Sequence, residues 1–294
     1  MNLTIPESEF ITPGHTACQG CGAMLAMRYA LKALGSKTMI TIPACCQVVT
    51  TGPVTSTNLK VPMFASAFAC AASTASGIKA GLEIQGKSDI NVVAWAGDGG
   101  TFDIGIQALS AAAERHDDIF YFCYDNEAYM NTGRQKSSAT PYGAWTMTTP
   151  KENLKNVPKK DIIGIMAAHK IEYIATLSIA YPEDFIRKVK KGMEIKGTKF
   201  FHILSPCPSG WLSKTEDSIK LSRLAVKSNL FPLFEIENGE KYTINYKFNE
   251  KTPVEDYLKL QGRFSFLNEE MVKEIQSTVD HSWNSLINKE SNQY

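Results

Sequence analysis

The sequence has no long hydrophobic run and no excess of charge of either sign. Its 294 residues include 31 lysines and arginines and 30 aspartates and glutamates, so the formal net charge is +1. This balance offers no electrostatic basis for binding nucleic acid or an anionic membrane surface. The longest small and apolar run, residues 64–78, is rich in alanine and serine and too short to span a bilayer. We therefore expect neither nucleic acid nor membrane as a partner, and we expect this run to pack closely in the core or against a partner.

No targeting segment and no internal repeat is visible, so we expect a cytoplasmic protein. Histidine is scarce, and the five histidines show no spacing typical of metal ligands: His15, His116, His169, His202 and His281. A chain of 294 residues can bury a full α/β core, and one large domain is expected.

Short apolar, β-branched segments alternate with helical segments over most of the chain. This alternation is typical of an α/β protein with a doubly wound parallel sheet. The pattern predicts strands at residues 38–43, 91–97, 119–125, 172–178 and 200–205. It predicts helices at residues 21–34, 66–84, 103–115, 161–170, 182–192 and 211–227.

The sequence changes character after residue 230. Residues 233–244 surround Asn238 and Gly239, and Asn-Gly is the strongest short signal for a β-hairpin. A polar helix is predicted at residues 268–288. We interpret residues 1–230 as the main domain and residues 231–294 as a hairpin-plus-helix extension that docks on this domain or on a partner.

Oxygen-bearing side chains follow two of the predicted strands. Asp98 comes directly after the strand at 91–97, and Asn126 follows the strand at 119–125. In a parallel α/β sheet, ligands bind beyond the carboxyl ends of the strands. Mg²⁺ prefers a carboxylate, one or two neutral oxygens and phosphate oxygens. The two strand ends therefore suggest a magnesium site.

Glycines surround Asp98. Gly97, Gly99 and Gly100 would let the backbone approach a diphosphate, and a helix starting near Phe102 would point free N–H groups at it. Gly-Asp-Gly followed about thirty residues later by asparagine resembles the thiamine-diphosphate-binding motif. Taken alone, Gly-Asp-Gly could be a glycine-rich turn after a buried strand. Asn126 at the end of the second strand favours the cofactor. Residues 134–160, with little periodicity, either fold over this cofactor or form a plain surface loop.

Cysteines in special contexts point to a second centre. Cys18 and Cys21 form a pair with two intervening residues, and glycine follows the pair. Cys45 and Cys46 end a short strand. Cys207 lies between two prolines, which stiffen the backbone around it.

Three interpretations of these cysteines compete. Disulfides are disfavoured because no signal peptide precedes them and the chain looks intracellular. Structural zinc and a [4Fe–4S] cluster both accept four thiolates, and sequence spacing does not separate them. A neighbouring thiamine site favours the cluster, because zinc cannot accept electrons. The remaining cysteines, Cys70 and Cys123, fall in apolar runs and are expected to be core residues.

Taken together, the sequence resembles the β subunits of the 2-oxoacid:ferredoxin oxidoreductases, most closely those of the pyruvate enzymes. The resemblance covers most of the chain. The motifs that carry it lie at residues 14–22, 97–105, 125–133, 139–144, 206–211 and 257–264.

The resemblance implies a set of site residues. The ligands of a [4Fe–4S] cluster would be Cys18, Cys21, Cys46 and Cys207. The neighbouring Cys45 departs from the family pattern, which commonly has a small residue there, and it is the alternative ligand to Cys46. Mg²⁺ would be bound by Asp98, the Asn126 side chain and the backbone carbonyl of Ala128. The diphosphate would be lined by Gly97, Gly99, Gly100 and Tyr129. Asn131 would face the thiazolium and the substrate as a catalytic residue, and Trp211 would pack over the cluster.

The resemblance also implies the reaction and the partners. The reaction is the oxidative decarboxylation of pyruvate to acetyl-CoA and CO₂, with electrons passing through the cluster to ferredoxin. An α subunit would supply the glutamate that activates the pyrimidine ring, because this chain has no second α/β domain and Glu127 is poorly placed. The expected subunits also include γ and a ferredoxin-like δ, and the chain would be active only with its partners.

Two alternatives remain open. One is a sister complex that acts on another 2-oxoacid, such as 2-oxoisovalerate, oxalate or an arylpyruvate. The other is a non-catalytic zinc- or cluster-binding scaffold that has lost thiamine. The scaffold would be expected to lack Asp98 or Asn126, and both residues are present.

Overall fold

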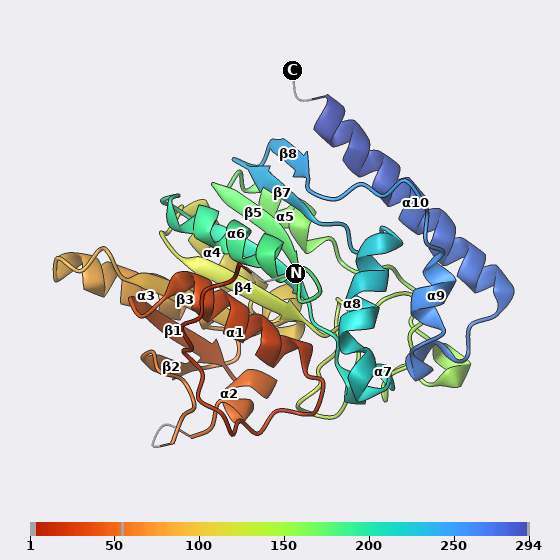
Figure 1. Ribbon diagram of the computed structural model, residues 1–294, viewed down its shortest axis with the longest axis horizontal. Coiled ribbons are helices and arrows are strands. Elements are labelled where there is room, and N and C mark those ends of the chain that lie inside the picture. The colour runs from red at the N-terminus through yellow and green to blue at the C-terminus, as the bar shows by residue number, and fades with distance from the viewer. Residues whose placement is uncertain (1–3, 54–55, 293–294) are drawn as a thin grey trace.

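The computed structural model describes residues 4–53 and 56–292, which form an α/β sheet covered by helices (Figure 1). The eight strands follow the order β2-β1-β3-β4-β6-β5-β7-β8. Six of them are parallel: β1 (Thr38–Pro43), β2 (Met63–Ser66), β3 (Asn91–Gly97), β4 (Phe120–Asp125), β5 (Tyr173–Ser178) and β6 (Lys199–Leu204). The antiparallel pair β7 (Phe234–Glu237) and β8 (Lys241–Ile244) extends the sheet beyond β5.

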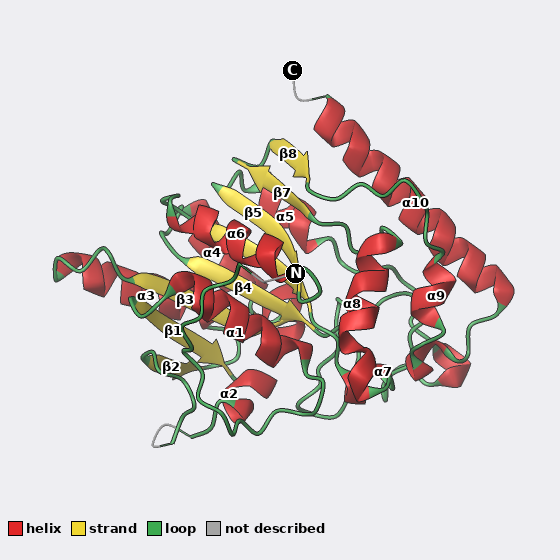
Figure 2. Ribbon diagram, in the orientation of Figure 1, coloured by secondary structure: helices red, strands yellow, loops and turns green. Residues whose placement is uncertain are grey.

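Helices cover both faces of the sheet, as Figure 2 shows. The helices α1 (Gly22–Leu34) and α6 (Pro182–Met193) bury their apolar sides on one face. The opposite face is covered by α3 (Ala71–Ile84), α4 (Ile106–Glu114), α5 (Ile162–Ala168) and part of α10 (Glu269–Ser291). The other α-helices are α2 (Cys46–Thr50), α7 (Pro208–Trp211), α8 (Ser218–Lys227) and α9 (Val254–Leu258).

The central strands are apolar on both sides because helices pack on both. In β3, Val93 and Trp95 belong to the cluster under α1, whereas Val92 and Ala94 belong to the cluster under α3 and α4. Such strands carry nearly continuous hydrophobic runs rather than an alternation of polar and apolar residues. The predicted α/β class and the doubly wound parallel sheet are confirmed. The predicted strands agree with the observed ones to within one residue at each end.

Three predicted helices are wrong in part. The helix expected at 66–84 starts at Ala71, because residues 63–66 form β2, which pairs with β1. The small and apolar run is therefore divided: Ala71, Ala72 and Ala75 are buried in the core, whereas Phe64 is 55% exposed. The helix expected at 211–227 is interrupted where Leu212 adopts a left-handed conformation with φ of 53°. The helix expected at 103–115 starts only at Ile106.

The hairpin and the last helix of the C-terminal segment are confirmed. Asn238 and Gly239 have φ of 52° and 72°, which this kind of turn requires. The α10 helix begins at Glu269, after the side chain of Asn268 accepts a hydrogen bond from Met271 N at 2.8 Å. Residues 1–3, 54–55 and 293–294, which belong to the two predicted segments, lie outside the described residues. None of the described helices is long and apolar enough to cross a membrane.

Candidate cofactor and metal site

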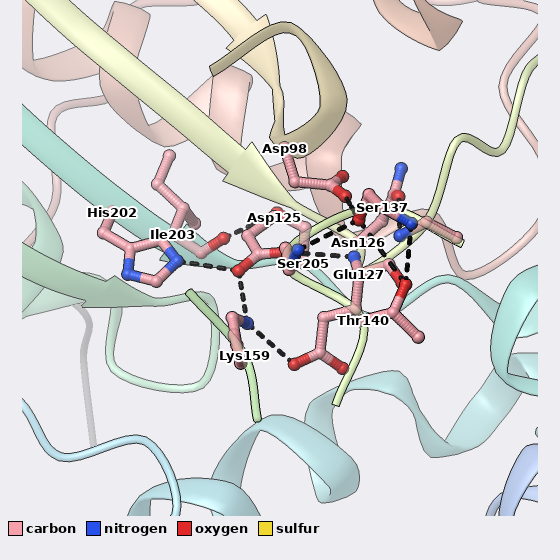
Figure 3. A network of polar contacts seen from close by, with 12 residues as sticks. Asp98, Asp125, Asn126, Glu127, Ser137, Thr140, Lys159, His202, Ile203 and Ser205 are labelled. Atoms are coloured by element: carbon pink, nitrogen blue, oxygen red, sulfur yellow. Dashed lines mark hydrogen bonds and ion pairs between the residues drawn. The ribbon is translucent and has the colours of Figure 1, made fainter. Parts of the chain in front are cut away.

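Asp98 and Asn126 lie together at the carboxyl edge of the sheet. The strands that precede them are neighbours, with Gly97 paired to Tyr124. One terminal atom of the Asn126 amide lies 3.1 Å from Asp98 Oδ1 and 2.7 Å from Ala128 O. Figure 3 shows Asp98 and Asn126 facing the same small space. The structure therefore brings together the three predicted magnesium ligands, which we call the oxygen site.

These spacings suit a small hard cation. Oxygens at 2.0–2.1 Å from Mg²⁺ in an octahedron lie about 3 Å apart when they are adjacent. With nitrogen at the shared position, the Asn126 amide donates to both Asp98 and Ala128. With oxygen there, the Asn126 amide oxygen lies at the spacing of adjacent Mg²⁺ ligands from both a carboxylate oxygen and a backbone carbonyl oxygen. The donor set at the oxygen site thus fits Mg²⁺.

Asp98 is the buried acid without a cationic partner of its own. Its side chain is 1% exposed, and among the described residues it forms no ion pair. The Ser137 hydroxyl donates to Asp98 Oδ2 at 2.5 Å. Burial, and then the negative charge of Asp125, raise the pKa of Asp98 well above its usual value. A bound divalent cation would relieve both effects.

The two neighbouring acids are already paired with cations. Asp125 forms an ion pair with Lys159 and a 2.8 Å hydrogen bond with His202 Nε2. Although burial opposes it, the Lys159 charge and the His202 contact hold the pKa of Asp125 below its usual value. Glu127 forms ion pairs with Lys159 at 2.9 Å and with Arg263 at 2.6 Å. Asp98 therefore remains as the acid available for a metal ion.

The backbone of residues 126–128 is fixed so that one carbonyl stays available. Asn126 O accepts a hydrogen bond from Trp211 Nε1 at 2.8 Å. Glu127 O accepts one from Thr140 Oγ1 at 2.7 Å. Ala128 O is the third carbonyl in the row and lies next to the Asn126 amide. Glu127 has φ of 66°, a conformation that few residues other than glycine adopt and that surrounding contacts must hold.

Aromatic rings pack tightly on the glycines of the motif. A Cβ on Gly99 would lie 2.2 Å from the Tyr129 ring, and one on Gly100 would lie 3.2 Å from the Phe68 ring. The Tyr129 hydroxyl donates to Asp103 Oδ2 at 2.7 Å. The expected helix near Phe102 is instead a π-helical turn, Gly99–Asp103, that begins directly at the strand end. The role of these residues in binding a diphosphate stays a prediction.

The segment 134–160 folds over the oxygen site and is not a plain surface loop. Ser137 and Thr140 are buried, and they contact Asp98 and the Glu127 carbonyl. Lys159 reaches the acids from the far end of the segment. Asn131 is exposed, and its catalytic role stays a prediction.

The four predicted cluster ligands, Cys18, Cys21, Cys46 and Cys207, form what we call the thiol site. Burial, and then the charges of the other three cysteines and of Cys45, together raise the pKa of Cys46 to about 12. Burial also raises the pKa of Cys207 to about 12, with added contributions from Cys21 and Cys18. The four thiols therefore influence one another electrostatically, but no three of them are placed to bind a metal ion in the part of the chain that the structure describes.

Close packing joins the two loops of the thiol site. Gly22 N donates to Pro206 O at 2.9 Å. A Cβ on Gly20 would lie 2.3 Å from Thr215 O, and one on Gly22 would lie 2.8 Å from Pro206 N. Glycine is therefore required on both sides of Cys21. A cavity of about 650 Å³, lined in part by Cys18 and Cys21, opens beside this packing.

Cys45 and Cys46 point to different surroundings. The Cys45 thiol is buried against the Tyr124 side chain and the backbone of Gly97, whereas Cys46 interacts with the other thiols. Cys46 was expected to end the strand, but it is the first residue of α2. The described residues hold no group of three or more His, Cys, Asp or Glu side chains placed to bind a metal ion. The choice of Cys46 over Cys45 as a cluster ligand stays a prediction.

Sequence reasoning missed several residues around the oxygen site. Ser137, Lys159 and His202 carry no local signal, because their roles depend on contacts between distant segments. Arg263 lies in a motif that already supported the resemblance, but no role was predicted for it. Trp211 was expected only to pack over the cluster, and its indole N–H also bonds the Asn126 carbonyl.

Comparisons with known proteins bear on the same features. Residues 45–203 match the family described as "Thiamine pyrophosphate enzyme, C-terminal TPP binding domain". The chain is 52% identical to the ketoisovalerate oxidoreductase subunit VorB of Pyrococcus horikoshii, over 97% of this chain and 94% of that protein. It is 49% identical to the pyruvate synthase subunit PorB of Methanocaldococcus jannaschii, over 95% of this chain and 96% of that protein.

A solved structure shares the fold. It is the 2-oxoglutarate:ferredoxin oxidoreductase from Magnetococcus marinus, with 2-oxoglutarate, coenzyme A and succinyl-CoA bound. The TM-score is 0.59 at 19% identity, over 76% of this chain and 84% of that chain. The similarity expected from the sequence motifs is confirmed. The chain belongs to the β subunits of the 2-oxoacid:ferredoxin oxidoreductases and contains the thiamine-pyrophosphate-binding domain of these enzymes.

Proposed function

We propose that this chain is the β subunit of a pyruvate:ferredoxin oxidoreductase. Its reaction is the reversible oxidative decarboxylation of pyruvate to acetyl-CoA and CO₂, with ferredoxin as the electron acceptor. The observation that carries the proposal is the convergence of Asp98, the Asn126 amide and Ala128 O at the carboxyl edge of the sheet. The packing of the loop that carries Cys18 and Cys21 against the loop that precedes Cys207 supports the redox part of the reaction.

The oxygen site would hold the Mg²⁺ of thiamine diphosphate. When bound, this coenzyme serves as the electron sink for decarboxylation. Asp98 supplies the negative charge, and Asn126 and Ala128 supply neutral oxygens. Gly97, Gly99, Gly100 and Tyr129 would line the diphosphate. Asn131 is exposed and follows the loop 126–128 in the sequence. It would face the thiazolium and the substrate.

The thiol site would hold a [4Fe–4S] cluster through Cys18, Cys21, Cys46 and Cys207. A cluster held there would accept electrons from the coenzyme. The neighbouring Cys45 thiol contacts the backbone of Gly97, so the two sites are separated by very few residues. Cys18 is exposed and lines the surface cavity, which supports an electron exit on this side.

Partner subunits would complete the active site. Glu127 is engaged by Lys159 and Arg263, so it cannot serve as the glutamate that activates the pyrimidine ring. We assign that glutamate to an α subunit and place γ and ferredoxin-like δ subunits in the same cytoplasmic complex. Residues 1–230 would form the cofactor-binding domain, and residues 231–294 the extension.

The second candidate substrate is ketoisovalerate. Subunits VorB of three Pyrococcus species are 50–52% identical to this chain, whereas subunits PorB are 42–49% identical. Coenzyme A as the acyl acceptor is supported by the related Magnetococcus marinus enzyme, which was solved with coenzyme A bound. A substrate panel is needed to separate the two candidates.

The test is anaerobic co-purification of the chain with its native partners. After this chain is separated from its partners, it should contain about four iron and four sulfide atoms per chain. The complex should reduce a low-potential dye when it is given coenzyme A and pyruvate, and more slowly with ketoisovalerate. Faster reduction with ketoisovalerate would select the second candidate, and zinc without iron would support the scaffold instead.

A further inference from the structure

We propose that Arg263 is a positioning residue for the metal-binding loop, acting through Glu127 from the C-terminal segment. The proposal rests on the proposed function of the oxygen site. It gives the C-terminal extension, residues 231–294, a role in cofactor binding in addition to docking.

Arg263 reaches the loop from a distant part of the sequence. It follows α9 and lies in a short 3-10 turn, Gly262–Phe264. Its side chain is 3% exposed, and one guanidinium nitrogen lies 2.6 Å from Glu127 Oε2. Its Nε donates to Gln261 Oε1 at 2.9 Å, which fixes the orientation of the guanidinium plane. A buried, oriented arginine is a strong constraint on the carboxylate that it binds.

The same guanidinium also packs on Trp211. The Arg263 Cζ lies 4.2 Å from the centre of the Trp211 ring. Trp211 Nε1 in turn donates to Asn126 O. Arg263 thus supports the loop at two points, through the side chain of residue 127 and through the carbonyl of residue 126.

Through Glu127, this support sets the direction of the Ala128 carbonyl. Glu127 lies between two proposed ligands, and its φ of 66° turns the chain so that Ala128 O faces the Asn126 amide. Side chains rarely hold this conformation unless contacts fix them. Lys159 and Arg263 bind different oxygens of the Glu127 carboxylate. Loss of Arg263 would let the peptide relax and turn the Ala128 carbonyl away from the ion.

The consequence is a change in metal affinity rather than in the chemistry itself. Arg263 contacts none of the three ligand atoms, so its removal leaves all three in the chain. Loss of an outer contact of this kind typically weakens metal binding by about 10- to 100-fold.

The experiment measures thiamine diphosphate binding to the assembled complex as a function of Mg²⁺ concentration. We expect Arg263→Gln to raise the Mg²⁺ concentration for half-saturation by about 10-fold or more, with the iron content unchanged. Arg263→Lys, which keeps the charge but not the planar fork, should give a smaller increase. The matched control is Arg115→Gln, which removes an exposed arginine–aspartate pair and should leave Mg²⁺ binding unchanged.

A double variant separates positioning from fold stability. Glu127→Gln with Arg263→Gln leaves no unpaired charge at this pair, so thermal stability should recover while Mg²⁺ binding stays weak. The proposal is overturned if Mg²⁺ half-saturation in Arg263→Gln lies within twofold of the wild type. It is also overturned if the double variant recovers both properties, or if neither variant assembles. A wild-type complex without Mg²⁺-dependent cofactor binding would instead refute the proposed function.

Discussion

The oxygen site is buried and held by hydrogen bonds from several segments, whereas the thiol site is open at Cys18. In the oxygen site, Ser137, Thr140 and Trp211 each donate to a fixed oxygen of Asp98 or of the loop 126–128. In the thiol site, burial raises the pKa of Cys46 and Cys207, so both are neutral thiols at physiological pH.

The two sites differ in what holds their ligands in place. In the oxygen site, hydrogen bonds from other segments hold Asp98 and the loop 126–128 in place. The thiol site requires loss of protons from its cysteines, so the cluster itself must complete it. Magnesium binding should therefore depend on distant supporting residues, and cluster binding should depend mainly on the ligands.

The largest expected effect follows from removal of the carboxylate in the oxygen site. Asp98→Ala deletes the one charged ligand, so Mg²⁺-dependent thiamine diphosphate binding should fall by about 100-fold or more. Iron content should not change, because the thiol site is separate. The control Asp89→Ala removes an exposed aspartate paired with Lys37 and should have no effect. Unchanged cofactor content in Asp98→Ala would refute the oxygen site.

The complementary test acts on the thiol site. Cys207→Ala should lose most of the iron and the electron transfer to dye, while thiamine diphosphate binding persists. Cys45→Ala is the matched control, because its thiol faces Tyr124 and Gly97 rather than the other thiols. Iron analysis of both variants checks the assignment. Loss of iron in Cys45→Ala but not in Cys46→Ala would exchange the two residues.

Acid should weaken the oxygen site. Burial and the charge of Asp125 raise the pKa of Asp98, and the metal binds only the ionised carboxylate. Protons therefore compete with Mg²⁺ at a higher pH than for an ordinary aspartate. Below this pKa, the Mg²⁺ concentration for half-saturation should rise by about 10-fold per pH unit. Titrations at several pH values would measure the slope, and a flat profile down to the usual aspartate range would contradict the pKa shift.

The smallest expected effect tests the connection between the two sites. Trp211 follows Cys207 in α7 and bonds the Asn126 carbonyl, so Trp211→Phe keeps an aromatic ring but removes the donor. An unsatisfied buried carbonyl costs about 1–3 kcal/mol of stability. Thermal unfolding and Mg²⁺ titration should both show a modest loss, with iron retained. Loss of iron with normal Mg²⁺ binding would place Trp211 with the thiol site alone.

The sequence predicted the features that depend on local rules. Asp98 and Asn126 were found because they follow recognisable strands, and parallel strands end at one edge. The hairpin was found because Asn238 and Gly239 suit its turn. These inferences need only the order of elements along the chain.

The missed features depend on tertiary contacts. Strand β2 has only four residues, and none of them is fully buried, unlike those of the other parallel strands. Its pairing with β1 is what identifies it as a strand. Lys159 and Arg263 are charged residues of ordinary appearance, and their burial follows from acids about 30 and 136 residues away in the sequence. No local pattern identifies such partners.

The most direct test of the account is a diffraction experiment at the iron absorption edge on the assembled complex with thiamine diphosphate and Mg²⁺. We expect an iron signal between Cys18, Cys21, Cys46 and Cys207, and a Mg²⁺ ion bound by Asp98, Asn126 and Ala128. Absence of iron between these cysteines, or a coenzyme bound away from the ends of β3 and β4, would contradict it.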